Sequence, residues 1–250
     1  RSVLVTGVQT CALPIFSSEY LYRRPWLTVR HERLELPDGR LVPDYYVLEY
    51  PNWVNITAIT RDGHFVLIDQ YRHGLGETSY EIPAGVSEPT DASMLDAARR
   101  ELAEETGYGG GEWQLLTTVA PNPATQNNLT HCFLATGVER LGTQHLDPTE
   151  DLRVHLMTRR EVLELLRSNR IRQALMAAPL WRYFAEHPSP EDALPAEAEE
   201  TDPATDGQLR EAAGAKSATP GNDPATAGNS PAAAEVGPTA VAAPDKLHGL

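Results

Sequence analysis

Three glutamates in the middle of the chain, Glu101, Glu104 and Glu105, stand at positions i, i+3 and i+4. On an α-helix this spacing puts the three carboxylates on one stripe, where like charges repel one another. Oxygen ligands of this kind suit hard cations such as Mg²⁺. A solvated acidic helix end would show the same spacing, because glutamate is common on exposed helices. The three acids alone leave both interpretations open.

The residues around these acids predict the helix that carries them. Residues 97–108, AARRELAEETGY, contain good helix formers, and no Pro or Gly interrupts them before Gly107. Leu95, Ala98 and Leu102 recur three and four residues apart, which is the spacing of a core-facing stripe. Gly107 stands where a left-handed cap ends a helix. The acids then lie near the helix C-terminus, where anions oppose the macrodipole and a cationic partner is expected.

The wider stretch from Gly85 to Tyr108 resembles the Nudix box. That pattern is Gly, five residues, Glu, seven residues, and then Arg-Glu-apolar-x-Glu-Glu-x-Gly-apolar. Arg100 to Tyr108 fills the second half without a departure. The first half departs twice, because Asp91 stands at the Glu position and eight residues, not seven, precede Arg100. These departures leave the role of Asp91 open and keep the metal-binding half intact.

Composition excludes several classes of protein. The net charge of −14 argues against a general nucleic-acid binder, which would normally carry a basic face. No apolar run approaches the roughly 18 residues needed to span a bilayer. Cys11 and Cys132 have neither the number nor the spacing of a disulfide framework or a zinc site. The sequence therefore predicts a cytoplasmic protein without nucleic-acid or membrane partners.

Composition also divides the chain into four segments. Residues 1–16 lack the features of a cleavable signal peptide and are interpreted as a leader outside the fold. Residues 17–50 are predicted as an N-terminal β-hairpin subdomain and residues 51–187 as the hydrolase domain. Residues 188–250 are rich in Pro, Ala and acids, which predicts a disordered tail.

The pattern of strands and helices predicts an α+β domain with a mixed sheet. Within residues 26–50, the pair Asp38-Gly39 marks the turn of a two-stranded hairpin. Residues 53–60 and 65–72 predict a second hairpin. Further strands are predicted at residues 80–82, 113–120, 130–135 and 153–157, and helices at residues 159–168 and 170–186. The resemblance implies that these elements form the Nudix α/β/α sandwich.

Stretches outside the box resemble the ADP-ribose pyrophosphatase branch of the Nudix hydrolases. They are QYRHG at residues 70–74, EIPAG at 81–85, EDLRVHLMTRREV at 150–162, and Pro123, fifteen positions beyond Tyr108. The resemblance implies Mg²⁺-dependent cleavage of a nucleoside diphosphate linked to another moiety, with ADP-ribose giving AMP and ribose 5-phosphate. A nucleotide-sugar or dinucleotide pyrophosphatase is the alternative within the enzymes. A catalytically silent ligand-sensing domain is the alternative of another class, and the intact residues 100–107 speak against it.

The resemblance also assigns roles to single residues. It implies that Glu101, Glu104, Glu105 and the carbonyl of Ala84 bind Mg²⁺, with Mn²⁺ as a substitute. Glu104 is also a candidate catalytic acid. Arg100 is interpreted as an organiser that fixes a box carboxylate, against the alternative of an ordinary surface pair.

The remaining candidates lie outside the box. Glu150 is the best match to the catalytic base of the branch, although Asp147 and Asp151 are neighbours and all three fit a polar loop. Arg72 could grip a phosphate bidentately or be a solvated strand end. Trp26 could stack on a base, or it could belong to the core or an interface.

The aromatics of residues 26–50 lead to a prediction about assembly. An isolated hairpin is marginal in water, so Trp26, Tyr45, Tyr46 and Tyr50 need a surface to cover. The resemblance implies that this unit is exchanged between two subunits, which predicts a two-fold homodimer. The alternative is a monomer with the hairpin folded back on its own domain.

Overall fold

The structure, a computed structural model, describes residues 13–24 and 26–193 of the chain. Most of the predicted leader, including Cys11, lies outside the described residues. The predicted disordered tail also lies outside them from position 194 onward. Cys132 is a fully buried free thiol, as its apolar strand predicts.

The N-terminal sheet has three strands, where the sequence predicted two. It consists of β1 (Ile15–Arg24), β2 (Leu27–Glu35) and β3 (Leu41–Glu49), paired antiparallel in that order. The predicted turn joins β2 to β3, and Gly39 there has a φ of 85°. All of β1 is exposed, so no burial pattern marks it in the sequence. Its first two residues fall inside the segment predicted as a leader.

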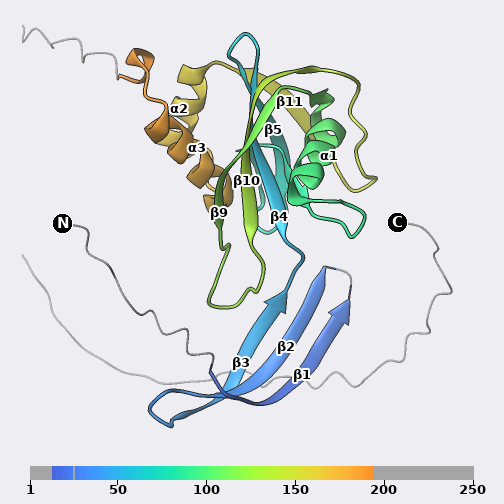
Figure 1. Cartoon of the computed structure of the whole chain (residues 1–250), viewed down its shortest axis with the longest axis vertical. Helices are drawn as coiled ribbons and strands as arrows, with labels where there is room; N and C mark the ends of the chain where they lie inside the picture. The colour runs from blue at the N-terminus through green and yellow to red at the C-terminus, as the bar shows by residue number, and fades with distance from the viewer. Residues whose placement is uncertain (1–12, 25, 194–250) are drawn as a thin grey trace, which may run out of the picture. The chain divides into compact units, whose positions relative to one another are not determined.

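A mixed sheet of eight strands forms the main domain (Figure 1). Its strands are β4 (Trp53–Thr60), β5 (Phe65–Arg72), β6 (Glu77–Glu81), β7 (Ala84–Val86), β8 (Tyr108–Gly109), β9 (Glu112–Val119), β10 (Thr130–Arg140) and β11 (Leu152–Met157). The order is β11-β5-β4-β10-β8, while β6, β7 and β9 pair with β5, β4 and β10. The pair β4–β10 is parallel and the other pairs are antiparallel, which confirms the mixed sheet and the second hairpin.

Helices cover both faces of this sheet (Figure 1). Helix α1 (Met94–Thr106) lies on one face, and α2 (Arg159–Arg167) and α3 (Ala174–Glu186) lie on the other. Alternate residues of β4 separate the two cores: Ile56 packs in the cluster with Leu102 of α1, whereas Ile59 packs in the cluster with Leu180 of α3. The α/β/α sandwich is therefore confirmed. None of the described helices is long and apolar enough to cross a membrane.

Local signals set the ends of the helices. The Ser93 side chain accepts a hydrogen bond from the Asp96 amide at the start of α1, and Gly107 ends it in the left-handed conformation with a φ of 74°. Thr158 and Glu161 form the capping box of α2. Helix α3 begins at residue 174, not at residue 170 as predicted.

The described chain continues past Pro188, where the sequence predicted the end of the ordered part. A short 3₁₀ turn, η1 (Pro190–Asp192), lies beside α2. The guanidinium of Arg159 donates two hydrogen bonds of 2.7 Å to the carboxylate of Asp192. This partly buried ion pair fixes the turn η1. The turn was not predicted because composition does not reveal a contact between Arg159 and Asp192.

Candidate active site

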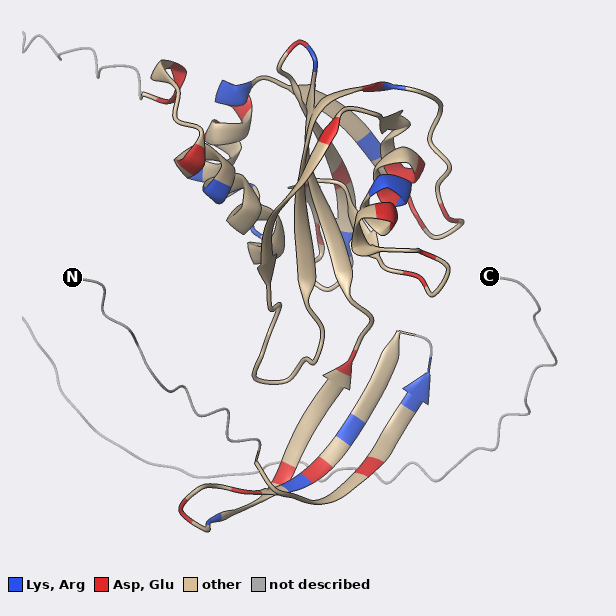
Figure 2. Cartoon of the chain, in the orientation of Figure 1, with Lys and Arg blue, Asp and Glu red and all other residues tan. Residues whose placement is uncertain are grey.

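Charged residues lie on α1 and on the loops beside it, while most of the central sheet is uncharged (Figure 2). Of the three acids in the predicted stripe, Glu105 is 4% exposed and the Glu101 side chain is 12% exposed. Only Glu104 has the exposure of a solvated helix residue, at 43% of its side chain. The interpretation as an ordinary solvated helix end is therefore wrong for two of the three carboxylates.

Burial makes these two carboxylates hard to ionise. It raises the pKa of Glu101 to about 7, and the charges of Glu104 and Glu150 raise it as well. Burial also raises the pKa of Glu105 well above its ordinary range, although the Ala84 amide donates a hydrogen bond of 2.9 Å to this carboxylate. Positive charge beside these two carboxyl groups would favour their ionised form, so the site favours binding of a cation.

Gly85 lets α1 approach β7 closely. A Cβ atom at this position would lie 2.1 Å from the Cδ of Glu101, so the carboxylate rests directly on the glycine backbone. The glycine that opens the box is therefore required for steric reasons, because any side chain at this position would displace Glu101.

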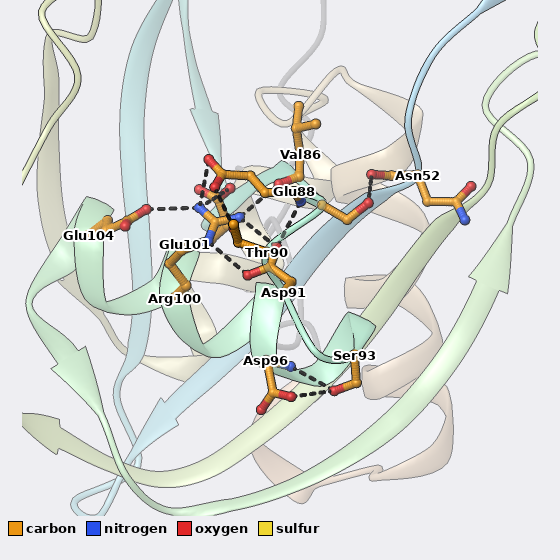
Figure 3. Close-up of polar contacts among 11 residues, drawn as sticks. Asn52, Val86, Glu88, Thr90, Asp91, Ser93, Asp96, Arg100, Glu101 and Glu104 are labelled. Atoms are coloured by element: carbon orange, nitrogen blue, oxygen red, sulfur yellow. Dashed lines mark hydrogen bonds and ion pairs between the residues drawn. The ribbon is translucent and has the colours of Figure 1, made fainter. Parts of the chain in front are cut away.

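Arg100 connects the acids to the loop before the helix (Figure 3). Its Nη1 donates to Glu101 Oε1 and to Glu104 Oε2, each at 2.9 Å. Its Nε and Nη2 donate to the two carboxylate oxygens of Asp91 at 3.1 and 3.0 Å, and Nη2 also donates to the Val86 carbonyl. The predicted pairing of Arg100 with box carboxylates is present in the structure.

Asp91, whose role the sequence left open, is a partner of this arginine. Its side chain is 7% exposed, and its hydrogen bond with Arg100 lowers its pKa below the ordinary range. Asp91 also accepts a hydrogen bond of 2.8 Å from the Glu88 amide, which closes the loop. An aspartate can therefore stand at the Glu position of the box and hold Arg100 bidentately.

The described residues contain no preformed cluster of three or more metal-binding side chains. In the structure, Arg100 holds Glu101 and Glu104, while the Ala84 amide holds Glu105. The donor set nevertheless fits a hard divalent cation, because it is made of carboxylates with an excess of negative charge.

Arg72 pairs with a buried acid that sequence reasoning missed. Its Nε and Nη2 donate to the two carboxylate oxygens of Glu81 at 2.7 and 2.5 Å, and Glu81 is fully buried. The alternative of a solvated strand end is therefore wrong. The sequence did contain a signal for this pair. Glu81 lies between Tyr80 and Ile82 in a strand that enters the core, and a buried carboxylate needs a cationic partner. Two-fifths of the Arg72 side chain stays exposed, so a phosphate role remains a prediction.

Glu150 lies within electrostatic range of the box. Its charge raises the pKa of Glu101 and of Glu105, and it also raises the pKa of Arg72. Its carboxylate accepts a hydrogen bond of 3.0 Å from the Asp147 amide within the loop that precedes β11. The structure thus brings the candidate base near the candidate metal ligands, and its catalytic role remains a prediction.

A cavity of about 710 Å³ opens beside these residues, which is the size expected for a nucleotide-sized ligand. Arg72, Glu81, Ala84 and Gly85 line it together with aromatic residues, among them Trp26, Tyr50 and Trp53. Trp26 is 79% exposed, so the alternative that it belongs to the core is wrong. Its position at the cavity is compatible with stacking on a base.

Two family profiles match the sequence. The one described as NUDIX domain matches residues 50–178, and the one described as nucleoside diphosphate sugar hydrolase N-terminal domain matches residues 16–48. The boundary between the two matches falls at Glu49, the last residue of β3.

Two curated bacterial proteins with the name ADP-ribose pyrophosphatase are each 31% identical to the chain. The match to the protein of Mycobacterium tuberculosis covers 50% of this chain and 60% of the relative, less than two thirds of its length. The match to the protein of Bacillus subtilis covers 58% and 78%.

A solved structure has the same fold. The crystal structure described as ADP compounds hydrolase superposes with a TM-score of 0.62 over 70% of this chain and 93% of that one. Its sequence is 23% identical, so the likeness concerns the fold alone.

Proposed function

Because the chain belongs to the NUDIX family, we propose that it cleaves the pyrophosphate of a nucleoside diphosphate linked to another moiety. The leading substrate is ADP-ribose, which would give AMP and ribose 5-phosphate. One observation carries this proposal: two residues that line the cavity also contact the buried glutamates of α1. Ala84 and Gly85 line the cavity, and the same two residues touch Glu105 and Glu101.

The residues that would hold Mg²⁺, or Mn²⁺ as a substitute, are Glu101, Glu104, Glu105 and the carbonyl of Ala84. A bound divalent cation neutralises charge on phosphate oxygens and lowers the pKa of a bound water. Arg100 holds the carboxylates of Glu101 and Glu104, so a bound cation would compete with this arginine for their oxygens.

Protein groups supply the other requirements of phosphoryl chemistry, which are positioning, charge and a base. Glu150 would accept the proton of the attacking water, with Glu104 as the second candidate for this role. Arg72 would donate to a phosphate oxygen while Glu81 fixes its guanidinium. Trp26 would stack on the base.

The names of the two bacterial relatives support ADP-ribose as substrate. The match of residues 16–48 to a nucleoside diphosphate sugar hydrolase domain favours nucleotide sugars as the second candidate. A cytoplasmic location fits the free, buried thiol of Cys132.

We also propose that the enzyme is a two-fold homodimer that exchanges the N-terminal sheet. The supporting observation is apolar exposure: Phe16, Tyr22 and Leu41 are all more than half exposed. The N-terminal sheet contacts the main domain of its own chain through β3. The Leu48 amide donates to the Thr125 carbonyl, and the Tyr45 hydroxyl donates to the Ala124 carbonyl. A hairpin folded back on its own domain would instead bury these apolar side chains.

A hydrolysis screen with Mg²⁺ tests the proposed reaction. ADP-ribose, NADH, GDP-mannose and diadenosine polyphosphates are the substrates, and chromatography identifies the products. ADP-ribose is expected to have the highest kcat/KM and to release AMP and ribose 5-phosphate. No hydrolysis of any of these compounds with Mg²⁺ or Mn²⁺ would contradict the proposal.

A further inference from the structure

Polar side chains lie on the cavity-facing side of two adjacent strands. Asn55 and Thr57 of β4 share a face with Ile59, which packs toward α3. In the parallel pair, Asn55 lies opposite Cys132 and Trp53 lies opposite Thr130. Asn55 and Thr130 are therefore diagonal neighbours on the face of the sheet opposite α1.

Two atoms of the residues that line the cavity on this face lack partners. Among the residues that the structure describes, neither Asn55 Oδ1 nor Thr130 Oγ1 has a hydrogen-bond partner, although each residue is only 1% exposed. Both residues line the cavity. The thiol of Cys132, which lies opposite Asn55 in the parallel pair, donates to the Thr130 carbonyl at 3.9 Å. Burial raises the pKa of this thiol, and the Asn55 side chain beside it lowers that pKa. A buried polar atom without a hydrogen-bond partner destabilises the protein, so a partner from the cavity is expected.

The chemistry of that partner follows from the orientation of Asn55. Its Nδ2 donates a hydrogen bond of 2.6 Å to the Leu175 carbonyl in the first turn of α3. This contact requires the amide nitrogen to point toward α3, which leaves Oδ1, an acceptor only, without a partner. The ligand group must then carry an N–H or O–H. An ionised phosphate has no hydrogen to donate, so the diphosphate does not fit at this position.

We propose that the side chains of Asn55 and Thr130 hydrogen-bond to hydroxyl or amino groups in the non-phosphate part of the substrate. The inference rests on the proposed function and names residues that select its substrate. The donor can come from the exocyclic amine of a nucleobase or from a sugar hydroxyl. A site built to bond such a group discriminates against analogues that lack it, because its buried polar atoms are then left unpaired.

Thr57 provides a matched control for Thr130. It is also fully buried, and its hydroxyl also has no partner among the described residues, but it does not line the cavity. The variants Thr130→Val and Thr57→Val each remove one unpaired hydroxyl at nearly constant volume. Both are expected to unfold at the wild-type temperature or above it.

The first experiment measures binding of ADP-ribose by calorimetry in EDTA, where turnover does not interfere. Thr130→Val is expected to weaken binding about 5- to 10-fold, the loss of one hydrogen bond, and Thr57→Val to leave it unchanged. Equal affinities of the two variants would overturn the inference, as would a wild type that does not bind ADP-ribose. Binding without hydrolysis would instead contradict the proposed reaction and leave the inference standing.

The second experiment identifies the donor with Asn55→Leu. Its affinity ratio to wild type is measured for ADP-ribose, for the inosine analogue that has a carbonyl in place of the amine, and for a deoxyribose analogue. A ratio that returns toward one for a single analogue identifies the group bound by Asn55. Equal losses for all three ligands would mean that Asn55 contacts neither group, and the inference would be wrong.

Discussion

Glu105 is the most deeply buried of the box carboxylates, and its role can be tested without disturbing the fold. In Glu105→Gln, the side-chain carbonyl can still accept the hydrogen bond of the Ala84 amide. Turnover with Mg²⁺ is expected to fall by orders of magnitude, while stability in metal-free buffer stays equal or rises because charge repulsion is removed.

Kinetics and urea unfolding of the same variant check both expectations. Glu112→Gln, an exposed acid at the start of β9, is the control and is expected to behave as wild type. Near-normal turnover of Glu105→Gln would mean that this carboxylate does not bind the metal.

Glu101 predicts a pH dependence of stability. Its pKa is about 7 in the folded protein against an ordinary value of 4.5, so between these pH values the folded state binds more protons than the unfolded chain. The free energy of unfolding in EDTA is therefore expected to fall as pH rises from about 4.5 to about 7, by on the order of 3 kcal/mol.

Urea titrations at pH 5 and pH 8 measure this loss. Glu101→Gln is expected to reduce it, and Mg²⁺ is expected to restore stability at pH 8 by binding the ionised form. A wild-type stability that stays constant or rises across this interval would contradict the buried environment of Glu101.

At the scale of residues, the sequence predicted which acids lie together on one helix and missed several of their partners. Arg100 and the glutamates were found because their spacing along one helix is a local property. Glu81 and the unpaired Asn55 escaped because their importance depends on strands that meet only in the folded sheet. The role of Asp91 stayed open for the same reason, since only the loop closure brings it to Arg100.

At the scale of elements, the close contact between β7 and α1 at Gly85 leads to a prediction about turnover. In Gly85→Ala the new methyl group would collide with the end of the Glu101 side chain, which is flexible, so the fold can adapt while the carboxylate moves. Turnover is expected to fall by about 100-fold with little change in Tm, because small displacements of catalytic groups are costly.

Gly142→Ala is the matched control, because a Cβ atom there meets no atom within 4 Å among the described residues. Kinetics and thermal unfolding compare the two variants. Equal activity of Gly85→Ala and wild type would mean that the position of Glu101 is not critical.

Elements with a buried face were predictable, and the exposed strand was not. Residues 65–68 form a continuous apolar run and are all buried in β5, and Gly107 ends α1 as its sequence signal predicts. Strand β1 has no such face, so neither hydrophobic alternation nor a turn signal marked it. The turn η1 escaped because it depends on Arg159, far away in the sequence.

For the molecule as a whole, the exposed apolar side chains of the N-terminal sheet predict self-association. Sedimentation at micromolar concentration is expected to give a species of twice the chain mass of 27.4 kDa. Phe16→Ser lies in β1, away from the predicted metal ligands, and is expected to shift the equilibrium toward the single chain. A fully active species at the mass of one chain would exclude the exchanged dimer.

The parallel pairing of β4 with β10 has a consequence for the order of folding. Strands β5 to β9 and helix α1 separate the two partners along the chain, so this pair forms only after a long loop has closed, which is slow. The β4–β5 hairpin and the doubly capped α1 need no such closure. Pulse-labelling hydrogen exchange is therefore expected to protect their amides before those of β10, and simultaneous protection would contradict this order. A chain emerging from the ribosome would thus form this hairpin and the acidic helix before β10 brings Thr130 to the proposed binding surface.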